Sequence, residues 1–130
     1  TQRETSPRTR GGDPSVDRDV FDAARLLDLV DGDETAFREI TTTFRETTRD
    51  LVSRLKEANE NKDVEAMRRV AHTLKGSAGS FFAGQLQRAS ARLEQVCTDG
   101  TFEEIARNVA TVVEAWNRLE DRMNAGNRAE

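Results

Sequence analysis

The distribution of proline constrains the fold of this chain more than any other feature. Both prolines, Pro7 and Pro14, lie near the N-terminus, so nothing forbids helix from Ser15 to Glu130. Alanine, leucine, arginine and glutamate, which are good helix formers, dominate that stretch. Hydrophobic residues make up 35% of the chain and charged residues 34%, which suits amphipathic helices around one economical core. The sequence therefore predicts a single all-α domain.

Apolar periodicity divides the chain into five expected helices. Asp33 is placed to cap the second helix, and Thr101 with Glu104 has the spacing of a capping box for the last. Short loops between long amphipathic helices favour an antiparallel up-and-down four-helix bundle with a short extra N-terminal helix. The expected helices cover about residues 19–30, 33–59, 63–80, 84–98 and 101–125.

These boundaries also predict the organisation of the chain. Residues 1–17 hold both prolines, a glycine pair and several arginines, so they are interpreted as a flexible linker or tail that cannot bury apolar surface. Residues 18–125 form the bundle, and residues 126–130 form a C-terminal tail. The apolar stripes include Ile40 and Phe102, while Phe81 and Phe82 are expected to close one end of the core.

The overall charge and the single cysteine exclude several functions. A formal net charge of -4 disfavours a nucleic-acid binder, because neutralising phosphates requires a basic face. Cys97 is the only cysteine, which excludes an internal disulfide and a multi-thiolate metal site, and we interpret it as a small apolar helix residue. No apolar run approaches the roughly 20 residues that span a bilayer, so we expect no direct membrane contact and a cytoplasmic location.

The third expected helix carries the only histidine of the chain, His72. At about 100° per residue, His72 lies roughly 130° from the centre of the apolar stripe of that helix. Core packing does not require a histidine there, so we expect its side chain on the flank or outer face of the bundle. The stripe consists of Val64, Met67, Ala71, Leu74, Ala78 and Phe81.

Basic residues and glycines are the helical neighbours of His72. An imidazole is a good nucleophile near neutral pH, and nearby cations attract an incoming phosphoryl group. A glycine inside a helix costs about 1 kcal/mol relative to alanine, which indicates close approach by another protein. Each feature alone is also typical of an incidental exposed histidine, a solvated helix face or a helix end. Helical geometry therefore leaves open whether His72 accepts a phosphoryl group or is incidental. The neighbours are Arg68, Arg69, Lys75 and Gly76, with Gly79 one turn further.

The string from His72 to Gly79, HTLKGSAG, closely resembles the phosphoacceptor motif of histidine-containing phosphotransfer domains. The resemblance covers about residues 18–124 and includes apolar and acidic positions in the flanking helices. One departure is Phe82, where the family often has glycine. The flanking positions that agree are Phe21, Asp22, Leu26, Leu27, Gly32, Asp33, Phe37, Phe44, Leu51, Leu55, Asp63, Leu86, Leu93 and Glu94.

The resemblance implies roles for individual residues. His72 would accept a phosphoryl group from the aspartyl phosphate of a receiver domain and pass it to another receiver aspartate. Lys75 would lie close to the phosphoryl group and offset its charge. Glu94, on the next helix, would hydrogen-bond the imidazole and orient it. The face that would meet the receiver comprises Arg68, Arg69, Gly76 and Gly79.

The resemblance also implies the partners. These are response-regulator receiver domains and a histidine kinase, and the Mg²⁺ used in such transfers belongs to the receiver, so no metal or cofactor is assigned to this chain. No Gly-rich phosphate loop is present, so we expect a phosphocarrier without its own ATP site rather than an enzyme. The default oligomeric state is a monomer. The first residue is Thr1 rather than Met, which is compatible with a fragment of a hybrid histidine kinase and with the cytosolic part of a membrane-bound kinase.

Two other functions remain open at this point. The phosphoacceptor domain of a chemotaxis-type histidine kinase uses a similar histidine helix and glutamate, although the first two helices favour the hybrid-kinase type. The other alternative is a non-catalytic helical interaction domain in which His72 has no chemical role. Labelling by a phosphorylated receiver would separate the phosphotransfer functions from the structural one.

Overall fold

The computed structural model describes residues 14–128 of the chain, with side chains from residue 17 to residue 124. These residues form helices and no strand, which confirms the predicted all-α class. Within this part of the chain, none of the helices combines the length and the apolar character that crossing a bilayer requires. The helices are α1 (Pro14–Val20), α2 (Ala23–Leu29), α3 (Glu34–Glu60), α4 (Val64–Ser80), α5 (Gly84–Asp99) and α6 (Phe102–Arg128).

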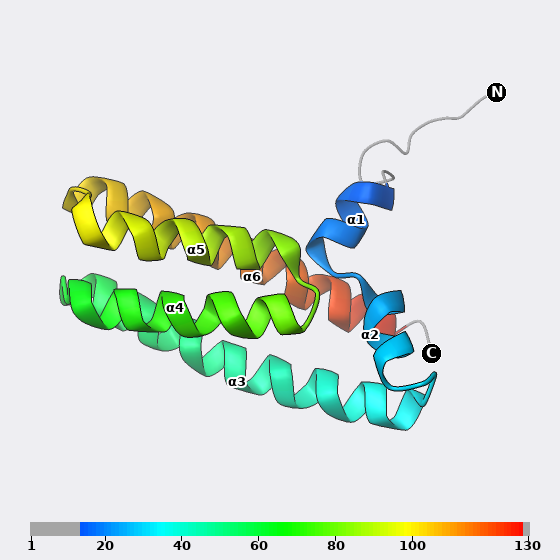
Figure 1. The fold of residues 1–130 in the computed structure, drawn as a ribbon. Helices are drawn as coiled ribbons and strands as arrows, with labels where there is room; N and C mark the ends of the chain where they lie inside the picture. The colour runs from blue at the N-terminus through cyan, green and yellow to red at the C-terminus, as the bar shows by residue number, and fades with distance from the viewer. Residues whose placement is uncertain (1–13, 129–130) are drawn as a thin grey trace.

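The four long helices α3 to α6 lie side by side, and consecutive helices run in opposite directions (Figure 1). Helix α4 packs between α3 and α5, while α6 completes the bundle against α5 and α3. The short helices gather at one end, where α1 contacts α5 and α6 and α2 contacts α3. Because α4 and α6 are diagonal partners, the outward side of α4 is free of other long helices.

Local capping explains where the helices begin. The side chains of Asp33 and Asp63 each accept a hydrogen bond from the backbone N–H of the residue three positions later, at a distance of 3.1 Å. Thr101 and Glu104 form the predicted capping box, in which each side chain binds the other residue's backbone N–H. Asp22 caps α2 as Asp33 and Asp63 cap their helices, because its side chain accepts a hydrogen bond from the Arg25 backbone N–H. Each cap satisfies a backbone donor that the first turn of a helix leaves unpaired.

Aromatic side chains fill the end of the core beside α2. The Phe81 ring stacks on Phe44, with centroids 3.9 Å apart, and on Phe21 at 5.3 Å. Phe82 follows in the left-handed conformation at φ 59°, and Ala83 N–H returns to the Ala78 carbonyl as in a Schellman turn. The departure from glycine at Phe82 has a structural use, because its ring lies 4.7 Å from the Arg25 guanidinium of α2.

The helix boundaries differ from the sequence prediction at both ends. A helix already begins at Pro14, inside the segment expected to be a tail, because proline suits the first position of a helix. The expected helix over 19–30 is two helices, since Asp22 caps a new one after Val20. The last helix continues to Arg128 rather than ending at 125. The remainder of the predicted tail, residues 1–13, lies outside the described residues.

Two residues of the predicted apolar stripes are exposed. Ile40 is 38% exposed and Phe102 is 56% exposed. The N-terminal turns of α3 extend past the end of α4 (Figure 1). Ile40, six residues after the start of α3, lines a groove with Leu29 of α2 and Ser80 of α4. Phe102 is the first residue of α6, where the Lys62 ammonium lies 5.7 Å from its ring. Periodicity therefore identified the correct helix faces but not where along each helix the core ends.

The fully buried hydroxyl of Thr48 supplies a stability prediction. Its Oγ1 atom has no hydrogen-bond partner among the described residues. Thr48→Val replaces this hydroxyl by a methyl group of the same shape, so we expect the free energy of unfolding to rise by about 1 kcal/mol. Urea denaturation, monitored by circular dichroism, measures this change in the free energy of unfolding. Thr111→Val is the control, because Thr111 is exposed and bonds the Arg107 carbonyl; a less stable Thr48→Val would contradict the prediction.

Candidate functional site

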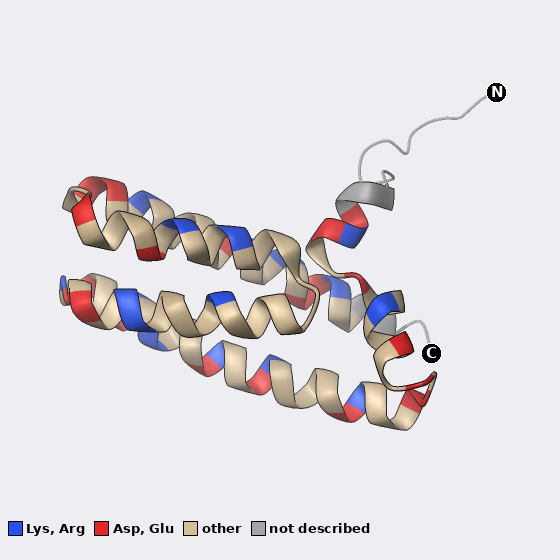
Figure 2. Ribbon diagram, in the orientation of Figure 1, with Lys and Arg blue, Asp and Glu red and all other residues tan. Residues whose placement is uncertain are grey.

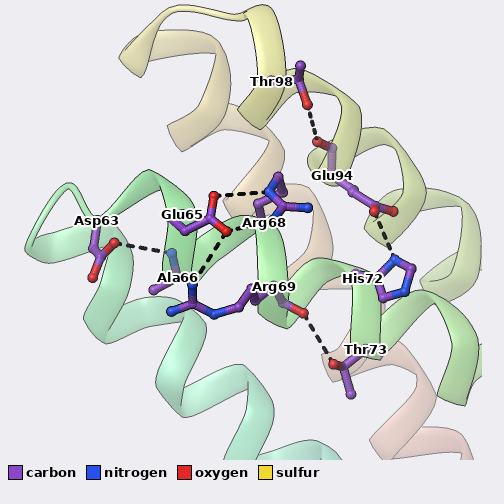
Figure 3. Close-up of polar contacts among 9 residues, drawn as sticks. All are labelled: Asp63, Glu65, Ala66, Arg68, Arg69, His72, Thr73, Glu94 and Thr98. Atoms are coloured by element: carbon purple, nitrogen blue, oxygen red, sulfur yellow. Dashed lines mark hydrogen bonds and ion pairs between the residues drawn. The ribbon is translucent and has the colours of Figure 1, made fainter.

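His72 lies on the outer flank of α4, on the side nearer α5. Its side chain is 66% exposed, and its Nδ1 atom lies 2.8 Å from Oε2 of Glu94 (Figure 3). An ionised carboxylate only accepts hydrogen bonds, so in the neutral ring Nδ1 carries the proton and donates it to Glu94. The lone pair is then on Nε2, across the ring from Glu94. The site therefore presents one exposed nitrogen nucleophile in a fixed tautomer.

Glu94 also binds Lys75, the cation one turn after His72. Its Oε1 atom lies 2.8 Å from the Lys75 Nζ atom, so ammonium, carboxylate and imidazole form one cluster across α4 and α5. The hydrogen bond from Lys75, followed by that from His72, holds the pKa of the Glu94 carboxyl below its usual range. Glu94 is consequently ionised at neutral pH. The sequence suggested each of these residues separately, but not the ion pair between Lys75 and Glu94.

The two arginines before His72 pair with an acidic residue of their own helix. Arg68 Nη2 lies 2.6 Å from Glu65 Oε2, and Arg69 Nη1 lies 3.4 Å from the same atom (Figure 3). The hydrogen bond from Arg68 is the main reason that the pKa of Glu65 is lowered. Sequence reasoning missed Glu65, although its spacing of three and four residues from the arginines predicts both pairs. Arg69 is exposed and Arg68 is half-buried, and both bind Glu65.

The two glycines near His72, Gly76 and Gly79, differ in the space around them. A Cβ atom built on Gly76 meets nothing within 4 Å among the described residues outside its own stretch of helix. Packing inside the chain therefore does not require glycine at position 76. A Cβ atom on Gly79 would lie 2.7 Å from Nε2 of Gln87 on α5, the mobile end of a long side chain. Gly79 thus has a neighbour within the chain, whereas a side chain at position 76 would meet open space.

An apolar groove borders the C-terminal half of α4 on the side away from Glu94. Ser77 and Ser80 of α4 lie in it, about 8 to 12 Å along the helix from His72 at 1.5 Å per residue. From Gly76 to Ala83 the chain has no charged residue, as the uniform tan of that segment in Figure 2 shows. The most exposed large hydrophobic side chain of the groove is Leu29, at 66%. The apolar groove is lined by Leu26, Leu29, Ile40, Phe44 and Phe81, with Glu39, Thr43, Thr47, Ser77 and Ser80.

Other reactive groups lie apart from this cluster. Among the described residues, no three His, Cys, Asp or Glu side chains are grouped so that they could hold a metal ion. Cys97 is buried on α5, and its burial raises the pKa of the thiol. A buried, protonated thiol is a poor nucleophile, so the chemistry available on this face belongs to His72.

Comparison with known proteins gives one match. The family model described as Hpt domain matches residues 39–125, which is more than half of the 130 residues and includes the whole of α4 and α5. No curated protein and no solved structure matches the chain.

Proposed function

The chain belongs to the Hpt domain family, and we propose that it carries a phosphoryl group on His72. Hpt domains are phosphocarriers of two-component phosphorelays, which exchange the group with receiver domains and kinases and are not themselves enzymes. We propose that this chain accepts the group from one receiver aspartate and passes it to another. The observation that carries the proposal is the bond from Nδ1 to Glu94, which leaves the exposed Nε2 atom as nucleophile.

The transfer is a displacement at phosphorus in which His72 supplies the attacking atom. The Nε2 lone pair forms a bond to phosphorus while the bond from phosphorus to the aspartyl oxygen breaks, and the receiver regains its carboxylate. The onward transfer is the same step in reverse, with a different carboxylate as acceptor. Glu94 aids both directions by fixing the ring orientation, which removes the need to order it when the receiver arrives.

Lys75 is the cation best placed to offset the negative charge of the phosphoryl group. It lies one turn after His72 and is held near the ring by Glu94. We propose that its ammonium contacts phosphoryl oxygens once the group is on Nε2, because a flexible four-carbon side chain reaches both the carboxylate and the phosphate. Arg68 and Arg69, which Glu65 holds a turn earlier, would meet the receiver surface rather than the phosphoryl group.

The docking surface for the receiver is proposed to extend from Gly76 into the apolar groove. Gly76 leaves backbone exposed beside His72, and the groove begins at the next residue, Ser77. A partner that covers about 800 Å² of each protein would span both features. The contiguous apolar lining of the groove, with Leu29 exposed at its edge, is typical of a surface that another protein covers. The Mg²⁺ that such transfers use is assigned to the receiver.

Labelling by a receiver tests the proposal. A receiver domain phosphorylated with radioactive acetyl phosphate is mixed with this chain, and we expect label to move to the chain within minutes in the presence of Mg²⁺. The phosphoryl group should be labile in acid and stable in base, as a phosphoramidate is. Radioactive ATP alone should give no label, since a phosphocarrier uses no nucleotide. Label that survives acid would place the group on a hydroxyl and would contradict the proposal.

A further inference from the structure

The residue that binds the His72 ring is a carboxylate, although orienting the ring does not require a charge. An amide oxygen would also accept a hydrogen bond from Nδ1 and would fix the same tautomer. Glu94 adds a full negative charge 2.8 Å from Nδ1, and its side chain is only 21% exposed, so water screens it less than it would a free surface group. This negative charge stabilises a positively charged ring more than a neutral one.

We propose that Glu94 keeps the proton on Nδ1 after phosphorylation, so that His72 releases the phosphoryl group as a neutral imidazole. This inference rests on the proposed function, because it concerns the phosphorylated form of the same histidine. Glu94 is then a positioning residue that holds a proton in place and thereby controls how readily the group leaves. It acts on release as well as on acceptance.

The electron count shows why this proton matters. When Nε2 bonds to phosphorus, its lone pair is used, and a ring that keeps the Nδ1 proton becomes a cation. When the bond from Nε2 to phosphorus breaks, the electron pair returns to Nε2 and leaves neutral imidazole, with no proton transfer needed. A ring that has lost the Nδ1 proton must instead leave as imidazolate. Imidazolate is a far stronger base and a correspondingly poor leaving group.

The charges around the ring favour the cation. Glu94 on α5 lies in contact with Nδ1, and the phosphoryl group adds negative charge at Nε2. Lys75 on α4 opposes a positive ring, but it is paired with the second oxygen of Glu94, and Arg68 is paired with Glu65. Among the described residues, no charged side chain of α3 makes a polar contact with the ring. Since Lys75 holds Glu94 ionised, the proton stays on the ring rather than moving to the carboxylate.

The test compares the wild-type chain with Glu94→Gln, which keeps the hydrogen-bond acceptor and removes the charge. Both chains are loaded on His72 with phosphoramidate, which needs no receiver, and release to a fresh receiver is followed from about pH 6 to about pH 9. We expect the two rates to be similar at the acidic end, where both rings are protonated. At the alkaline end Glu94→Gln should be about tenfold slower, because one opposite charge at hydrogen-bond distance is lost.

Phosphorus NMR of the loaded chains reports the ring proton independently of any receiver. We expect the titration of the phosphohistidine signal to move to lower pH in Glu94→Gln. Glu103→Gln, which makes the same change of net charge at an exposed position of α6, should behave as wild type in both experiments. Equal pH profiles and equal NMR titrations for Glu94→Gln and wild type would overturn the role of Glu94 in release. That result would leave the proposed function intact, whereas a wild-type chain that cannot be labelled on His72 would refute the proposed function itself.

Discussion

The His72→Gln variant is expected to take up no phosphoryl group from a phosphorylated receiver, a loss of at least about a hundredfold. Glutamine has no ring nitrogen that can form a phosphoramidate, and His72 is the only histidine in the chain. The fold should survive, because the His72 side chain is 66% exposed. We expect the free energy of unfolding to change by less than about 0.5 kcal/mol. Filter-binding counts of acid-labile label and urea denaturation measure the two effects.

A loss of labelling has meaning only if receiver binding persists. The affinity of His72→Gln for the unphosphorylated receiver, measured by calorimetry, should remain within about threefold of wild type, because the apolar groove and Gly76 are unchanged. Acid-labile label on His72→Gln at the wild-type rate would show that another residue carries the phosphoryl group.

Gly76→Gln is expected to block transfer while making the chain more stable, a combination that only an intermolecular role for Gly76 predicts. A side chain at position 76 meets no described neighbour, so the helix gains propensity and the free energy of unfolding should rise by about 0.5 kcal/mol. The same side chain projects beside His72, where it would hold the receiver away from Nε2. Displacement of the reacting atoms by even 1 Å costs about a hundredfold in rate. Rapid-quench measurement of transfer from the receiver tests this.

Two companion variants define the size limit at this position. Gly76→Ala adds one methyl group and should slow transfer much less than Gly76→Gln. Ala110→Gln places the same glutamine at an exposed position of α6, the helix diagonal to α4, and should transfer normally. If Gly76→Gln transferred at the wild-type rate, the receiver would not approach this side of the helix, and the docking surface would have to lie elsewhere.

Local sequence rules predicted much of this fold. The apolar spacing of α4 identified both its buried stripe and the exposed flank with His72, because a helix has a fixed rotation per residue. Asp33 and the pair Thr101 and Glu104 marked helix starts that the structure confirms. Composition did not predict the start at Pro14, because proline is common in tails as well as in the first turn of a helix.

Relations between helices were harder to predict. The ion pair of Lys75 with Glu94 depends on how α4 and α5 are rotated against each other, which neither helix encodes alone. The apolar groove exists because α3 extends beyond α4, and helix lengths alone do not show which turns remain uncovered. The contact of Glu94 with the ring was suggested by family resemblance, not by spacing. The pairing of Arg68 with Glu65, by contrast, lies within one helix and was available from the sequence.

The most direct test of the central claim is to locate the phosphoryl group on the ring. The chain is labelled with nitrogen-15 histidine, phosphorylated by a receiver, and studied by NMR; with one histidine, all ring signals belong to His72. The structure predicts coupling between phosphorus and Nε2, with the proton on Nδ1 still bonded to Glu94. Coupling of phosphorus to Nδ1, or an unchanged ring in a chain that carries label, would contradict the claim that His72 is the phosphocarrier through its exposed nitrogen.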